Sequence, residues 1–82
     1  LTLEDRFTLA GLYAAAEKYA DAEREARLAI ESAPTDPRAA RLLANVLSWK
    51  KDYTDAIRVY EKLIAASPDD ADLKRSLAQI LL

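Results

Sequence analysis

The stretch from residue 37 to residue 70 reads PRAARLLANVLSWKKDYTDAIRVYEKLIAASPDD. When it is moved back by 34 residues, it meets a second copy of its own pattern without a gap. The matched pairs include Leu9 with Leu43, Ala10 with Ala44, Tyr19 with Tyr53, Asp21 with Asp55, Ala22 with Ala56, Ile30 with Ile64 and Pro34 with Pro68. Chance agreement between Ala-rich segments does not also align prolines and Asp-Ala pairs. A fixed period of this length therefore indicates an array of repeated structural units.

The same shift carries Leu43 and Ala44 onto Leu77 and Ala78, where a third copy begins. We therefore expect a single repeat domain over residues 1–82. Its units are 3–36 and 37–70, followed by a half-repeat over 71–82. The chain opens at Leu1 and stops within the third copy. We expect it to be a piece of a longer array.

Proline and aspartate mark where one unit ends and the next begins, and a subtler break at Glu17-Lys18 and at Lys51-Asp52 divides each unit into two helices. Pro34 and Pro68 bias the residue before them away from the helical conformation, so a helix ends before each. Asp36 followed by Pro37 is typical of an N-cap and a first helical residue, and Asp70 suits the next N-cap. Thr2 and Asp5 have the spacing of a capping box. The predicted helices cover residues 3–16, 20–33, 37–50, 54–66 and 70–82, which makes the protein all-α.

The helix predicted over residues 37–50 is apolar on two faces. Ala40, Leu43, Ala44 and Leu47 form one face, and Leu42, Val46 and Trp49 form the other. Such a helix is wedged between neighbours, as stacking in a repeat array requires. Small residues recur where helices would cross, and these are Ala10, Ala22, Ala44, Ala56 and Ala78.

This arrangement resembles the tetratricopeptide repeat, a 34-residue helix–turn–helix unit. The second unit carries the likeness through Leu43, Ala44, Leu47, Ala56, Tyr60 and Pro68. The Trp that opens the family pattern is replaced by Arg6, Ala40 and Lys74. Ala26 stands where an aromatic residue is usual, and the turn within each unit has no Gly. The resemblance implies a right-handed α-solenoid of antiparallel helix pairs.

The resemblance also implies a function, which is to bind a peptide or a partner protein in a concave groove lined by the first helix of each unit. The residues carried over to this groove are Phe7, Gly11, Arg38, Arg41, Asn45, Ser48, Trp49, Arg75 and Gln79. Asn and Gln match the donors and acceptors of a peptide backbone, and Arg suits carboxylates. We therefore expect a peptide with some acidic character.

Two of these assignments have alternatives. Arg38, Arg41 and Arg75 could be ordinary solvated surface residues. For Trp49, the stronger interpretation is a plug packed between the second and third units. The alternative is an aromatic wall of the groove, since Trp often anchors binding.

Other functions lack the residues they need. The sequence has no His and no Cys, which removes the commonest general base and soft metal ligands. Its single Gly excludes a Gly-rich phosphate loop. We therefore expect no enzyme, cofactor or metal site. The formal charge of −2 is spread over the chain, so we expect no nucleic-acid partner. No apolar run approaches the ~20 residues that span a bilayer, so we expect no membrane insertion.

An architectural role is the alternative function, in which the array is a spacer or self-associates. The last predicted helix has no second helix to cover it, so Leu77, Ile80, Leu81 and Leu82 are at risk of exposure. The stretch Val46-Leu47-Ser48-Trp49, followed by Asp52-Tyr53, also looks like repeat arrays in bacterial cell-envelope proteins that support polysaccharide export. That likeness would imply a periplasmic scaffold.

Overall fold

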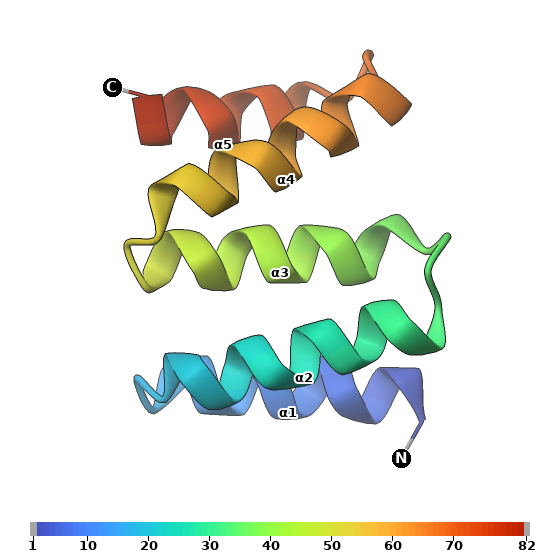
Figure 1. Ribbon diagram of the computed structural model, residues 1–82, viewed down its shortest axis with the longest axis vertical. Helices are drawn as coiled ribbons and strands as arrows, with labels where there is room; N and C mark the ends of the chain where they lie inside the picture. The colour runs from blue at the N-terminus through green and yellow to red at the C-terminus, as the bar shows by residue number, and fades with distance from the viewer. Residues whose placement is uncertain (1, 82) are drawn as a thin grey trace.

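The computed structural model describes residues 2–81, which form helices throughout (Figure 1). The elements are α1 (Leu3–Ala15), α2 (Tyr19–Ser32), α3 (Pro37–Trp49), α4 (Tyr53–Ala66) and α5 (Ala71–Leu81). Each described boundary lies within one residue of the prediction, and the all-α class is confirmed. Leu82, which was expected to end the last helix, lies outside the described residues.

The helix starts follow the predicted capping chemistry. The Asp5 amide donates to Thr2 Oγ1 and the Thr2 amide donates to Asp5 Oδ2, both at 3.1 Å, which completes the capping box. Asp36 Oδ1 accepts from the Arg38 amide at 2.9 Å, with Pro37 as the first helical residue. Asp70 Oδ1 accepts from the amides of Asp72 and Leu73. Each cap satisfies amides that have no partner inside the helix.

The turns inside the two units have the same backbone geometry. Glu17 and Lys51 have positive φ values of 62° and 68°, a conformation in which Gly is usual. The amide that follows each of them donates to a carbonyl five residues back, from Lys18 to Tyr13 and from Asp52 to Leu47, both at 2.8 Å. These bonds close the ends of α1 and α3, so each turn keeps its shape without Gly.

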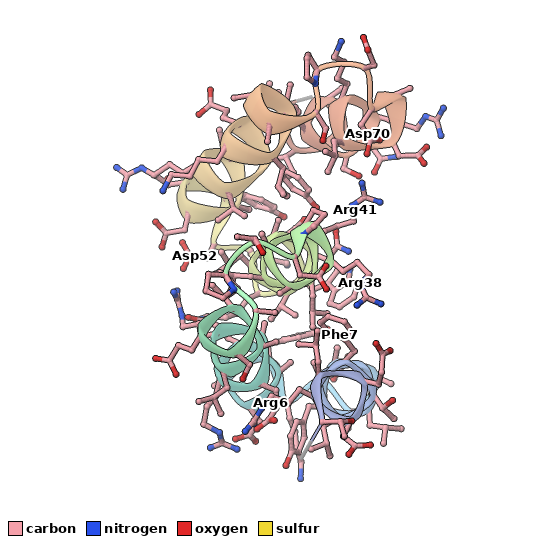
Figure 2. The ribbon with its side chains drawn as sticks, turned by 90° about the vertical axis from the view of Figure 1, so that its right-hand side faces the viewer. Arg6, Phe7, Arg38, Arg41, Asp52 and Asp70 are labelled. Carbon is pink, nitrogen blue, oxygen red and sulfur yellow. The ribbon has the colours of Figure 1, made fainter. Side chains whose placement is uncertain are left out.

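The helices form two layers. Figure 2 shows α1, α3 and α5 on one side of the molecule and α2 and α4 on the other. α3 packs against α2 and α4 and also touches α1. α3 and α4 supply most of the main core cluster, to which α2 and α5 add one residue each; the cluster comprises Ala26, Leu43, Ala44, Leu47, Ala56, Tyr60, Leu63 and Leu73. The prediction of a wedged third helix is therefore confirmed.

Small side chains allow close crossings in the first two units. Ala10, Ala22, Ala44 and Ala56 are all fully buried. Ala78, the equivalent residue of α5, is exposed. The prediction that the apolar residues of the last helix are exposed was wrong for Leu77 and Ile80, because both pack against the core cluster. Leu81 is 64% exposed.

Candidate functional site

A cavity of about 450 Å³ opens between α3 and α5, on the side of the molecule that bears Phe7 and Arg41 in Figure 2. It is lined by Asn45, Ser48, Trp49, Tyr53, Tyr60, Ser76, Gln79 and Ile80. The structure thus brings together four of the residues expected in the groove: Asn45, Ser48, Trp49 and Gln79. We call this space the groove cavity.

The groove cavity is lined by neutral polar groups around an aromatic wall. The Tyr60 hydroxyl donates a 2.6 Å hydrogen bond to Asn45 Oδ1. Burial raises the pKa of Tyr60, so its hydroxyl stays protonated and remains a donor at neutral pH. The Asn45 amide nitrogen keeps its two donors, and Gln79 is exposed at the rim. The cavity therefore offers both donors and acceptors and carries no charged lining residue.

A second, shallower cavity of about 370 Å³ lies beside the first unit and is lined by Gly11, Ala14, Ala15, Tyr19 and Trp49. A Cβ atom built on Gly11 would meet no atom within 4 Å, so open space lies over this residue. Trp49 borders both cavities and is 49% exposed. The interpretation of Trp49 as a plug packed between units was therefore wrong. The second and third units do not enclose its ring, because Trp49 borders open space on the side of α5 and on the side of Gly11, Ala14 and Ala15 of α1.

Each of the three groove arginines is paired with a carboxylate of the chain itself. Arg38 Nη2 lies 2.8 Å from Asp36 Oδ2, and its guanidinium lies 5.2 Å from the centre of the Phe7 ring. Arg41 Nη2 lies 2.6 Å from Asp70 Oδ2, and Figure 2 shows the two side chains facing each other. The loosest pair joins Arg75 to Asp72 at 3.4 Å, with both side chains more than two-thirds exposed.

The pKa shifts of the partner carboxylates agree with this pairing. The hydrogen bond from the Arg38 side chain lowers the pKa of Asp36. The pKa of Asp70 is lowered first by the backbone hydrogen bond from Leu73 and also by Arg41. Both carboxylates are therefore ionised at neutral pH. The arginines were predicted to receive ligand carboxylates, but in this structure internal carboxylates already occupy them.

Sequence reasoning missed four residues of the groove cavity: Tyr53, Tyr60, Ser76 and Ile80. Tyr60 comes from the second helix of its unit, whereas the groove was expected to be lined by the first helices. Its ring is buried, yet its hydroxyl reaches the groove side. Ser76 lies three residues before Gln79 on α5, so helical spacing alone could have placed them on one face.

Other features of the described chain bear on function class. Over residues 2–81, no cluster of three or more acidic side chains is arranged to hold a metal ion. Within the same range, every helix is too short or too polar to cross a membrane.

The comparisons with known proteins bear on the repeat. A family model described as "Tetratricopeptide repeat" matches residues 37–80, just over half of the chain. No curated protein matches the chain. The likeness to polysaccharide-export proteins gains no support from these comparisons. The five-helix stack, the period of 34 residues and the family match agree, and the chain belongs to the tetratricopeptide repeat family.

Proposed function

We propose that this chain is a non-catalytic protein-interaction module that holds a peptide segment of a partner protein along α1, α3 and α5. The groove cavity carries the proposal. Its Asn, Gln and Ser side chains match the donors and acceptors of a peptide backbone, and Trp49 gives an apolar surface. Binding a protein partner is also the usual role of this repeat family.

The neutral groups supply the affinity in this proposal, and the arginines adjust the preference for sequence. Arg38 and Arg41 already pair with Asp36 and Asp70, which offset much of their charge, so a ligand carboxylate that reaches either guanidinium gains little. Arg75 has the loosest and most exposed internal partner. A peptide with an acidic residue beside α5 is therefore the preferred ligand.

The second cavity extends the same site. It adjoins the groove cavity at Trp49, and the space over Gly11 accepts a side chain of the ligand. A peptide that places one residue in each cavity contacts Trp49 from both.

Selection from a random peptide library tests the proposal. Peptides selected on the unaltered chain should lose affinity at least about tenfold when Trp49→Ala and Gln79→Ala are combined, because both substitutions strip the groove cavity. Arg58→Ala is the matched control, since Arg58 is exposed on α4, in the other layer. Selected peptides that bind both variants as well as the unaltered chain would rule out this site.

Self-association is the second candidate function, and one observation favours it. Leu81 is 64% exposed at the end of α5, and exposed apolar side chains favour association. In this alternative the array acts as an architectural spacer that stacks end to end. Sedimentation equilibrium at high protein concentration should then detect oligomers that Leu81→Lys disperses. A chain that stays monomeric at every concentration would exclude association through this end.

A further inference from the structure

A third cavity, of about 460 Å³, is lined by residues of α2, α3 and α4 and of the α2–α3 loop. Its lining comprises Arg27, Ile30, Pro34, Ala40, Leu43, Val59, Lys62 and Leu63. We call it the rear pocket, because α2 and α4 form the layer opposite the groove side in Figure 2. None of its residues lines the groove cavity, so it is a separate surface.

The two units differ at this place in the repeat. In the first unit, Arg6 and Glu25 occupy the positions of Ala40 and Val59. Arg6 Nη1 lies 3.0 Å from Glu25 Oε1, and Glu25 is only 6% exposed. The first unit therefore fills this place with a long, largely buried ion pair. In the second unit the small side chains of Ala40 and Val59 stand at these positions, and the rear pocket is the space they leave open.

The chemistry of the rear pocket is that of an amphipathic site. Its floor is aliphatic, and Ile30, Ala40 and Val59 keep part of their surface exposed. Water gains few hydrogen bonds over such a floor, so an apolar group displaces it readily. The volume lies within the range of roughly 300–1,000 Å³ that is typical of ligand pockets.

The only charged groups of the lining are two cations, one on each wall. Arg27 stands on α2 and Lys62 on α4. Arg27 is held by Glu23 at 2.9 Å, whereas Lys62 makes no ion pair with any of residues 2–81. A ligand that enters the floor between the two walls can therefore pair a carboxylate with Lys62 without displacing another acid, while a carboxylate on the other side gains a weaker attraction from the already paired Arg27.

We infer that the rear pocket binds a partner peptide through one aromatic side chain flanked on both sides by acidic residues. The aromatic ring packs on Ala40, Val59 and Leu63, while one carboxylate pairs with Lys62. The carboxylate on the other side approaches Arg27. This surface is independent of the groove, so one copy of the chain holds two peptide segments at once.

The test uses the peptide acetyl-Asp-Phe-Asp-amide, titrated into the chain with ¹³C-labelled methyl groups. The methyl signals of Ile30, Val59 and Leu63 should shift and saturate at millimolar peptide, whereas acetyl-Asp-Ala-Asp-amide should leave them in place. Lys62→Glu should weaken binding about fivefold or more, which is the size expected for losing one exposed ion pair. Lys74→Glu is the matched control, because it makes the same charge change on an exposed residue of α5.

Ala40→Trp gives the complementary variant, since an indole ring should fill the pocket and abolish the methyl shifts. Circular dichroism checks that the Ala40→Trp variant folds. If this variant is unfolded, the Lys62→Glu variant still tests the inference. Absent shifts at millimolar peptide would overturn the inference. Equal affinities of the Lys62→Glu and Lys74→Glu variants would also overturn it. The groove proposal is tested by a different measurement, which is the affinity of selected peptides for the combined Trp49→Ala and Gln79→Ala variant, so the two proposals can fail independently.

Discussion

The hydroxyl of Tyr60 on α4 donates a 2.6 Å hydrogen bond to Oδ1 of Asn45 on α3. The bond ties the second helix of the unit to the groove face of the first. At the same repeat positions the first unit has Ala26 and Gly11, which cannot form such a bond. This one difference explains why the groove is polar and well defined beside the second unit and open beside the first.

Tyr60→Phe should lower the free energy of unfolding by about 1 kcal/mol, because it removes one hydrogen bond while the buried ring stays in place. Urea denaturation measures the change. Tyr53→Phe is the control, since Tyr53 is 45% exposed and should be unaffected. Equal stability of the two variants would show that the bond contributes nothing.

Lys51→Gly should stabilise the chain by about 0.5–1 kcal/mol, because Lys51 has a φ of 68° that Gly adopts without steric strain. Lys51→Ala separates the backbone effect from the loss of charge, since Ala keeps the strain. Thermal unfolding should rank the Gly variant above the Ala variant. The reverse order would mean that the turn is not strained.

Ala44→Leu should destabilise the chain by roughly 1–3 kcal/mol, because Ala44 is fully buried at a helix crossing and a larger side chain overpacks it. Ala78→Leu makes the same change at the equivalent, exposed position of α5 and should alter stability by less than about 0.5 kcal/mol. Urea denaturation of both variants distinguishes a crossing from a surface position, and similar losses would contradict the packing described.

Asp70 should make stability depend on pH. Its pKa is lowered in the folded chain, so its contribution is complete above the unfolded value of about 3.9 and is lost as pH falls through the folded value. Asp70→Asn keeps a capping side chain but loses the charge that faces Arg41. The variant should melt below the unaltered chain at about pH 7, and the two should converge as the pH falls below the folded pKa of Asp70. If the difference in melting temperature stayed the same at every pH, the effect of the substitution would come from the helix cap and not from the charge of Asp70.

The fold was predictable from local signals. Pro37, Asp36 and Asp70 act on the helix that contains or follows them, so their effects could be deduced without tertiary contacts. The conformations of Glu17 and Lys51 could not, because neither residue favours a positive φ. There the packing of paired helices overrides local preference.

The candidate site was predictable only in part. The family resemblance placed Asn45 and Ser48 in the groove, and both line the groove cavity. The pairing of Arg41 with Asp70 joins residues 29 positions apart and depends on how α5 stacks beside α3. The exposure of Trp49 depends on the small side chains of α1 opposite it. Such contacts are set by the spacing between units, which a repeat pattern does not specify.

Trp49 itself provides the most direct test of the central claim, that a peptide binds along α1, α3 and α5. It is the only Trp of the chain, it is half exposed, and it borders both the groove cavity and the second, shallower cavity. A peptide selected on this chain should shift Trp49 fluorescence to shorter wavelength and protect it from acrylamide quenching as it binds. A peptide that binds with unchanged Trp49 emission and quenching would contradict the claim.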